Sequence, residues 1–300
     1  ILYLNILYLN ILYLNILYLN ILLYNIMKQT IFHLEDRKGI YIYHFIFYNL
    51  AGLYYIENKL YNIKGRDCNK NGSTFPILNK VVAEPSQKII YPIKIHMNDI
   101  KQFHREAFEI IKDKFILVED LNSLEDYEVV NIYGGLCDNL NVPTTHYIRD
   151  LFIARINKPS NRNKRIFITR KNSEVYHNNT LKRYIFNENE LMEALIKYNF
   201  EYIQLESLNF KEKIEIFMCS EIIISSHGSQ LSFISLCDRN TNIIEICNNG
   251  TIGFPNDQNY NIASTLDLKY ERYSKINEDR NGNFKLNIQE FTNHIFKNMY

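Results

Sequence analysis

Apolar and polar stretches alternate regularly over the second half of the chain, after residue 164. Short apolar runs are typical of strands buried in a parallel sheet, and apolar positions three or four apart are typical of helices. A strand–helix series of this kind predicts a parallel sheet with right-handed crossovers. The expected strands are 165–169, 202–205, 222–225, 243–247 and 269–273, and the expected helices are 191–198, 210–218, 230–237, 258–267 and 288–299.

The first half shows the same alternation with less regularity. Its most apolar stretch, 40–60, predicts a long helix, and the polar residues inside it make a core helix a better interpretation than a membrane span. The other expected elements are strands at 115–118 and 129–133, apolar runs at 77–82 and 89–95, a helix capped by Asn98 and a helix at 144–156.

Two helices of the second half carry a specific start signal. Asn209 with Glu212, and Asn287 with Glu290, have the spacing of a capping box, in which the two side chains each bind a backbone amide of the first turn. We therefore expect helices to begin after Asn209 and Asn287.

The polar, basic segment 158–164 contains Pro159 and is the best candidate for a linker. It divides the chain into an N-terminal half, 27–157, and a C-terminal half, 165–300. Each half is expected to be Rossmann-like, so the predicted fold is α/β, with two parallel sheets facing a cleft.

Residues 1–20 repeat the sequence ILYLN four times. The repeat matches neither the helical nor the strand period, and its regular asparagines are costly in lipid. It also lacks the basic segment and the cleavage site of a signal peptide. We expect residues 1–26 to be a low-complexity extension outside the fold; a membrane anchor is the alternative.

Composition narrows the classes of function. Lys and Arg total 34 against 33 Asp and Glu, so there is no general basic field to hold nucleic acid. The five cysteines form no CxxC pair, which argues against a disulfide framework or a zinc site of the usual spacing. We expect a reduced, intracellular setting, in the cytoplasm.

The stretch that carries most chemical information follows the apolar run Ile222–Ile224. Ser226, His227, Gly228 and Ser229 come next, and the pattern reads as strand, tight turn and short helix. Glycine permits a sharp turn and a close approach to a ligand, and the free N–H groups at a helix start favour an anion. A phosphate-bearing ligand at the carboxyl end of a parallel sheet is therefore the first hypothesis.

Polar residues elsewhere have a functional and a structural interpretation. Arg170 ends an expected strand and could neutralise an anion with Arg183, although such cations are usually solvated. Glu245 lies in an apolar strand, where a carboxylate needs partners; it could hold ribose hydroxyls or form a salt bridge with either arginine. Asn187 and Glu188 could bind a ligand or only cap the following helix.

Several motifs in order resemble glycosyltransferase family 61. The similarity covers roughly residues 41–273, and it is strongest after residue 165. Ser229 and Gln230 stand where the family usually has Ala and Gly. The matching segments are Tyr43–Phe45, Ile168–Lys171, Arg183–Glu188, Glu206–Phe217, Ser226–Leu231, Ile243–Ile246 and Tyr260–Tyr270.

The resemblance implies a GT-B arrangement in which the C-terminal half binds a UDP-sugar such as UDP-GlcNAc or UDP-xylose. It also implies transfer to a hydroxyl of a protein or glycan acceptor, with inversion and without a bound metal or other cofactor. His227 would be a catalytic residue that donates to the diphosphate or the sugar, although a structural hydrogen-bond partner is the alternative. UDP would leave toward His227, Gly228 and Arg170. The donor-binding residues would be Arg170, Arg183, Asn187, Glu188, Ser226, Gly228, Ser229, Gln230 and Glu245.

An inverting transfer needs a base near the N-terminal half to deprotonate the acceptor. His44 is a candidate with a suitable side chain, although a core histidine is an equal interpretation. Two other functions stay open: a non-catalytic relic that binds nucleotide sugars, motivated by Ser229 and Gln230, and a membrane-anchored structural protein, motivated by the repeat.

Overall fold

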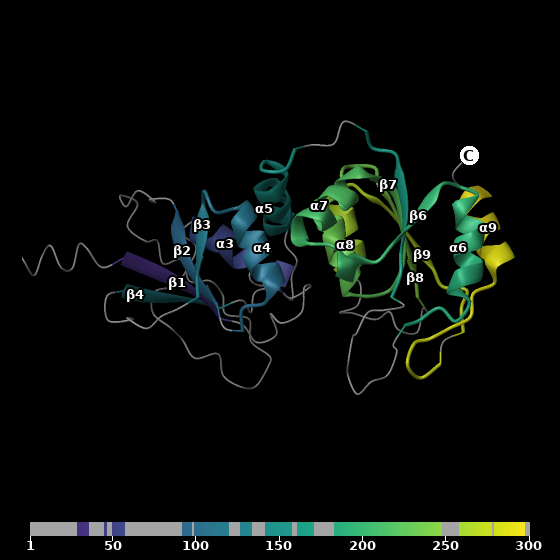
Figure 1. Ribbon diagram of the computed structural model, residues 1–300, viewed down its shortest axis with the longest axis horizontal. Coiled ribbons are helices and arrows are strands. Elements are labelled where there is room, and N and C mark those ends of the chain that lie inside the picture. Colours follow the sequence, from purple (N-terminus) through teal and green to yellow (C-terminus); the bar gives the residue numbers. More distant parts are fainter. Residues whose placement is uncertain are drawn as a thin grey trace, which may run out of the picture.

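The computed structural model is a layered α/β structure with two parallel sheets (Figure 1). It describes residues 29–35, 45–46, 50–57, 92–97, 99–119, 127–133, 142–157, 161–170, 183–247, 258–277 and 279–297. Helices lie between the two sheets, and a further helical layer covers the outer face of the second sheet (Figure 1). The predicted α/β class is confirmed.

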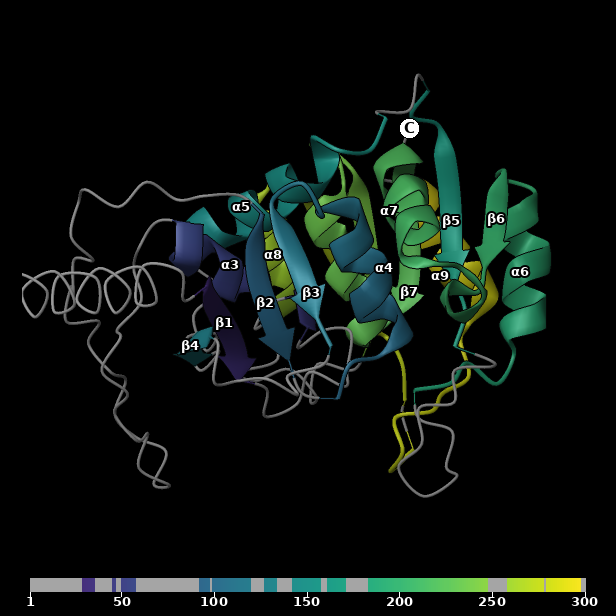
Figure 2. The ribbon, with the colours of Figure 1, turned by 60° about the vertical axis from the view of Figure 1, so that its left-hand side comes forward.

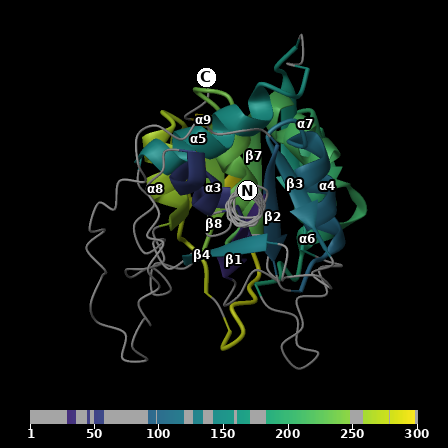
Figure 3. The ribbon, with the colours of Figure 1, turned by 90° about the vertical axis from the view of Figure 1, so that its left-hand side faces the viewer.

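The N-terminal sheet has the strand order β3-β2-β1-β4, and all of its pairs are parallel. In the end-on view of Figure 3 this sheet faces the viewer. Its strands are β1 (Gln29–Glu35), β2 (Ile93–Met97), β3 (Phe115–Val118) and β4 (Tyr127–Tyr133), and its helices are α3 (Leu50–Glu57), α4 (Gln102–Ile110) and α5 (Val142–Ile153).

The C-terminal sheet has the order β6-β5-β7-β8-β9, again with parallel pairs. Its strands are β5 (Lys164–Ile168), β6 (Phe200–Ile203), β7 (Ser220–Ser226), β8 (Asn242–Ile246) and β9 (Lys269–Tyr273). Its helices are α6 (Glu188–Ile196), η3 (Leu205–Ser207), α7 (Phe210–Cys219), η4 (Ser229–Leu236), α8 (Gln258–Thr265) and α9 (Ile288–Lys297).

Local sequence signals explain the helix starts. The predicted capping box at α7 is confirmed: the Asn209 side chain accepts from the Glu212 N–H at 2.9 Å, and the Glu212 carboxylate accepts from the Asn209 N–H at 2.8 Å. Before α9, Asn287 accepts from the Glu290 N–H at 3.1 Å. These bonds satisfy amides that a helix leaves unpaired in its first turn.

Several predicted boundaries were wrong. The strand expected at 202–205 is β6, which begins earlier, at Phe200, and ends at Ile203. It cannot extend to Leu205, because Leu205 begins the 3-10 turn η3. The helix expected after Asn98 begins at Gln102, where the Lys101 N–H donates to Nδ1 of His104 at 2.9 Å. Strand β1 was not anticipated from the sequence.

The helix expected at 230–237, where the sequence reads as amphipathic, differs in character from that expectation. It is the 3-10 helix η4, and its residues Leu231–Leu236 are all buried. The serine hydroxyls inside it are satisfied locally: Ser232 donates to the Ser229 carbonyl at 2.6 Å and Ser235 to the Ser232 carbonyl at 2.8 Å. Burial on all sides is possible because these polar groups need no water.

Some predictions lie wholly or partly outside the described residues. The repeat in 1–26 and the run at 77–82 are outside, as are 158–160 of the linker. Within 40–60, the structure describes 45–46 and helix α3. The division of the chain into two domains with a linker at 158–164 stays a prediction.

One hydrophobic cluster joins the two halves. Phe210 of α7 packs against Phe45 and Phe152 from the N-terminal half, with ring centroids 6.1 and 5.4 Å away. Phe210 also lies 5.5 Å from Phe233 of η4. Figure 2 shows α4 beside α7, and the same cluster includes residues of both sheets. The helical layer is thus a shared core rather than two separate surfaces.

Two polar contacts reinforce this join. The Phe210 N–H, at the start of α7, donates to the Glu106 carboxylate of α4 at 2.8 Å. Arg149 of α5 lies 3.3 Å from the Asp238 carboxylate, which follows η4. Both contacts connect a helix of the N-terminal half to the C-terminal half, one at the start of α7 and one just after η4.

A second apolar cluster lies on the opposite face of the C-terminal sheet, beneath α6 and α9. Phe291 of α9 packs edge-on against Tyr273 of β9 with centroids 4.9 Å apart. The sheet is therefore covered on both faces, which explains the continuous apolar runs of β7 and β8. Over the ranges that the structure describes, no helix has both the length and the apolar character that crossing a membrane requires.

Truncating Phe210 is expected to loosen both halves together. Phe210→Ala leaves a cavity in the shared cluster and should lower the free energy of unfolding by about 3–5 kcal/mol. Urea unfolding followed by circular dichroism measures this. Ile196→Ala, at a side chain that is 59% exposed, is the control and should cost about 0.5 kcal/mol or less. Equal stability of the two variants would contradict the shared core.

Candidate functional site

The order of the C-terminal sheet reverses between β5 and β7. The chain runs from β5 outward to β6, returns to β7 on the other side of β5, and continues to β8 and β9. In open parallel sheets, ligands bind outside the carboxyl ends of the strands at such a switch point. Arg170 follows β5, and Ser226, His227 and Gly228 end or follow β7. These residues flank the switch point.

Arg170 is buried against the turn after β7, with only 6% of its surface exposed. Its Nη1 donates to Oε1 of Gln230 at 2.6 Å and to the His227 carbonyl at 3.4 Å. The alternative of a solvated surface cation is therefore wrong. Its position at the strand end brings the guanidinium onto the turn itself.

Gln230 connects this arginine to the strand end. Its amide nitrogen donates to Oγ of Ser225 at 3.1 Å and to the Ser226 carbonyl at 2.8 Å, while its oxygen accepts from Arg170. The side chain expected to contact a ligand is therefore engaged in holding Arg170. Ser226 itself is buried, and Ser229 is exposed at the start of η4.

Gly228 is needed for room rather than for an unusual backbone conformation. Its φ of 166° is extended and open to any residue, so the expected turn is present but does not need glycine for its backbone conformation. A Cβ at this position would overlap Nη1 of Arg170 and Oε1 of Gln230. Glycine allows the arginine to lie across the backbone of the turn.

A second cation lies near Arg170. Burial and the charge of Arg183 lower the pKa of Arg170 to about 10, partly opposed by Glu206, so the Arg170 guanidinium is still charged at neutral pH. Arg183 is exposed and has a left-handed φ of 60°, uncommon for a residue with a side chain. No described residue accepts a hydrogen bond or forms an ion pair with its side chain. Two neighbouring cations favour an anion beside them.

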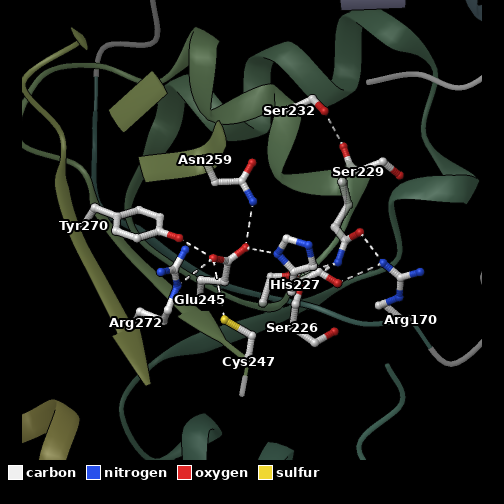
Figure 4. A network of polar contacts seen from close by, with 12 residues as sticks. Arg170, Ser226, His227, Ser229, Ser232, Glu245, Cys247, Asn259, Tyr270 and Arg272 are labelled. Atoms are coloured by element: carbon white, nitrogen blue, oxygen red, sulfur yellow. Dashed lines mark hydrogen bonds and ion pairs between the residues drawn. The ribbon is translucent and has the colours of Figure 1, made fainter. Parts of the chain in front are cut away.

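A buried carboxylate organises the other side of the turn (Figure 4). Glu245 of β8 has no exposed surface, and its Oε1 lies 2.8 Å from Nδ1 of His227 and accepts from Asn259 at 2.7 Å. Its Oε2 accepts from the Tyr270 hydroxyl and lies 3.5 Å from Nε of Arg272. The sulfur of Cys247 is 3.8 Å from the same oxygen.

These partners keep Glu245 ionised. Burial acts to raise the pKa of its carboxyl, but the hydrogen bond and charge of His227 and the hydrogen bonds from Tyr270 and Asn259 outweigh this, and the pKa falls below its usual value. Burial and the Glu245 charge raise the pKa of Tyr270, so the phenol stays protonated and donates. The carboxylate is thus satisfied in the way that a buried charge requires.

The expected salt bridge from Glu245 to Arg170 or Arg183 was wrong. In the sheet register, Glu245 faces Ser225 of β7 on one side and Arg272 of β9 on the other, whereas β5 is two strands away. Arg272 is therefore its cationic partner. Because the carboxylate is fully buried and bound by protein groups, we assign it to supporting His227 rather than to holding ribose.

Asn187 and Glu188 both contact other parts of the protein, and their expected contact with a ligand stays a prediction. Asn187 clamps the backbone of Leu286 with two hydrogen bonds of 2.9 Å, and its side chain does not cap α6. Glu188 is buried and accepts from the hydroxyls of Thr169 at 2.8 and 2.9 Å and Tyr202 at 3.1 Å. It fixes the end of β5 beside β6. The capping alternative is thus wrong for Asn187.

Sequence reasoning missed the residues around Glu245. Tyr270 and Arg272 alternate along β9, so they share a face of the sheet, and Asn259 comes from α8. A tyrosine and an arginine two positions apart on one strand can predict partners for a buried glutamate on the neighbouring strand. This prediction is possible only when the strand order is known. His44 lies outside the described residues, and its proposed role as base stays a prediction.

Comparison with known protein families identifies the family of this chain. A model of the family Glycosyltransferase 61 matches residues 42–244, which is more than half of the chain. The protein therefore belongs to glycosyltransferase family 61, and its parallel sheets agree with a GT-B-like fold. Membership identifies it as a glycosyltransferase that uses a nucleotide-sugar donor and a glycan or protein acceptor. A search among curated proteins found no match.

Acid is expected to weaken the fold through Glu245. Because its pKa is lowered in the folded state, its stabilisation is fully present above the ordinary glutamate pKa of about 4.3 and is lost as the pH falls through the folded value. Glu245→Gln should lower the free energy of unfolding at pH 7 by about 3–5 kcal/mol, since it breaks a buried ion pair.

Urea unfolding of both proteins at pH 7 and at lower pH measures this difference, which should narrow as acid protonates Glu245 in the wild type. Glu271→Gln, on the neighbouring strand β9, is the matched control. Glu271 also pairs with a histidine, His294, but its side chain is 39% exposed, so about 1 kcal/mol or less should be lost. A difference at Glu245 that stays constant with pH would contradict the assignment.

Proposed function

We propose that the protein transfers a sugar from a UDP-sugar to an acceptor hydroxyl, with inversion and without a bound metal. The observation that carries the proposal is the cation Arg170 at the switch point of the C-terminal sheet, with Arg183 as a second cation near it. The diphosphate is the part of a nucleotide sugar that such a pair recognises.

The diphosphate is proposed to lie over the turn 226–230. Gly228 gives the Arg170 guanidinium room to lie across the backbone there, and the first residues of η4 follow directly. Backbone N–H groups at a helix start and guanidinium groups both stabilise phosphate oxygens. Ser229, exposed at the start of η4, is the serine placed to contact them.

The reaction follows from this placement. The acceptor oxygen attacks C1 of the sugar from the face opposite the diphosphate, a bond from that oxygen to C1 forms, and the bond from C1 to the phosphate oxygen breaks. This single displacement inverts the anomeric centre. UDP leaves with both electrons of the broken bond, and Arg170 and Arg183 stabilise the developing charge, which is work that a metal ion does in other enzymes.

The acceptor proton must pass to a base on the N-terminal side. His44 remains the proposed candidate. The donor classes proposed, UDP-GlcNAc or UDP-xylose, and the acceptor, a protein or a glycan, rest on the family resemblance. The reaction needs no redox cofactor, because one carbon–oxygen bond replaces another and a proton moves from the acceptor to the base, with no change of oxidation state.

A second candidate function is nucleotide-sugar binding without turnover. Ser229 and Gln230 in the turn motivate it, as residues that depart from the family pattern. Against it, Gln230 accepts a hydrogen bond from Arg170 and so holds the guanidinium at the proposed donor site. The departure from the family pattern therefore supports the site. Binding of UDP by calorimetry, combined with absence of both hydrolysis and transfer for any UDP-sugar, would select this alternative.

Removing the Arg170 charge is expected to slow the chemistry. Arg170→Ala should reduce kcat by about 100-fold, because it removes a group that stabilises the leaving diphosphate. UDP release from UDP-sugars is the measurement, repeated after dialysis against EDTA, which should leave the wild-type rate unchanged. The control is Arg105→Ala, at an exposed ion pair with Glu119. Unchanged turnover in Arg170→Ala would reject the leaving-group role.

A methyl group at position 228 is expected to weaken donor binding. In Gly228→Ala the added Cβ displaces Arg170 and Gln230 from their contacts. Calorimetry with UDP should show affinity lowered by about tenfold or more, since a charge-assisted bond contributes about 1.5–3 kcal/mol. Ser264→Ala, at an exposed site on α8, controls for the substitution itself. Wild-type affinity in Gly228→Ala would contradict this placement of the diphosphate.

A further inference from the structure

The imidazole of His227 has one nitrogen committed and one open. Nδ1 faces the ionised Glu245 carboxylate at 2.8 Å, so this nitrogen must carry the hydrogen of the contact. Nε2 has no hydrogen-bond partner among the described residues. It is not one of the buried polar atoms without a partner, so it is exposed to solvent. The side chain is 22% exposed. Nε2 is therefore accessible at the carboxyl edge of the sheet.

The carboxylate that fixes this ring is itself held from three directions. Asn259 comes from α8, Tyr270 and Arg272 from β9, and His227 from the end of β7. Figure 4 shows the four side chains around Glu245, with Arg170 on the other side of the turn. A carboxylate bound in this way cannot rotate without breaking several contacts, so the orientation of the imidazole is set by the fold.

The open nitrogen belongs to the same turn as the proposed diphosphate site. Arg170 donates to the backbone carbonyl of His227, and Gly228 is the next residue. The cation, the imidazole and the start of η4 are thus parts of a single short segment. A hydrogen-bond donor placed there would face an anion rather than an acceptor hydroxyl.

We propose that Glu245 is a positioning residue that holds His227 as an imidazolium, so that its Nε2–H donates a hydrogen bond to the departing diphosphate. This inference rests on the proposed function. The carboxylate offsets the positive charge of the ring, and the bond from Nε2–H strengthens as the bond from C1 to the phosphate oxygen breaks. No proton is transferred to or from His227; the acceptor proton leaves through the separate base.

The most direct test is nitrogen NMR of the full-length protein labelled with ¹⁵N-histidine. The chain has eight histidines, and His227→Gln assigns the resonances of His227. With UDP present, both ring nitrogens of His227 should carry hydrogen, and UDP should shift the Nε2 resonance. Calorimetry on the same sample reports UDP binding independently.

The outcomes separate the two proposals. UDP that binds by calorimetry but leaves the Nε2 resonance of His227 unchanged, or a ring without hydrogen at Nδ1, overturns this inference and leaves the donor site standing. Absence of UDP binding overturns the proposed function, and the inference falls with it.

Variants test the role of Glu245 in turnover. Glu245→Gln should lower kcat by about tenfold or more and change KM for the donor by less than about threefold, because the lost interaction acts mainly in the transition state. The resonances of His227 should shift to a neutral ring. Glu271→Gln, which changes the Glu271–His294 pair on β9, should alter neither kcat nor these resonances.

If Glu245→Gln does not fold at the assay temperature, Tyr270→Phe gives the same test with a smaller change. It removes one donor to Glu245 without altering charge. A reduced kcat with a shifted His227 resonance supports the inference. Wild-type kcat in a folded variant whose His227 resonances have changed overturns it.

Discussion

A carboxylate without exposed surface is the interaction on which the site depends. Glu245 accepts from groups on a neighbouring helix and strand, and it holds the ring of His227 at the end of β7. A buried charge is costly unless every lone pair is used. The cost is met by residues from three elements, so the carboxyl ends of β7, β8 and β9 are fixed relative to one another at the place where the ligand is proposed to bind.

The turn after β7 is held as firmly on its other side. Gln230 clamps Arg170 across the bare backbone of Gly228, and the 3-10 helix η4 that follows is buried among α5, α7 and α8. Through α5 and the Phe210 cluster, the N-terminal half packs against the elements beneath this turn. The site is therefore preorganised: its charged groups are in place before a ligand arrives, which is the condition for electrostatic stabilisation of a leaving group.

Much of the second half was predictable from its sequence. Continuous apolar runs located β5, β7, β8 and β9 within a few residues, because a strand covered on both faces must be apolar throughout. The strand ends then placed Arg170 and His227 at one edge. Family 61 membership, anticipated from ordered motifs, is confirmed over 42–244.

The remaining features depend on neighbours that sequence patterns do not specify. The partners of Glu245 follow from strand order and register, which put Arg272 beside it and β5 two strands away. The need for glycine at 228 comes from a side chain that crosses it, 58 residues earlier in the chain, rather than from its own backbone. Strand β1 was not predicted because its ends, Gln29 and Glu35, are polar and its apolar centre is short.

The central claim is that the turn 226–230, between Arg170 and the Glu245–His227 pair, seats the diphosphate of the donor. A crystal structure of the full-length protein with UDP tests it most directly. The account predicts phosphate oxygens within hydrogen-bond distance of the Arg170 guanidinium and of Nε2 of His227, above Gly228. UDP bound at another edge of either sheet, with this turn empty, would contradict the account.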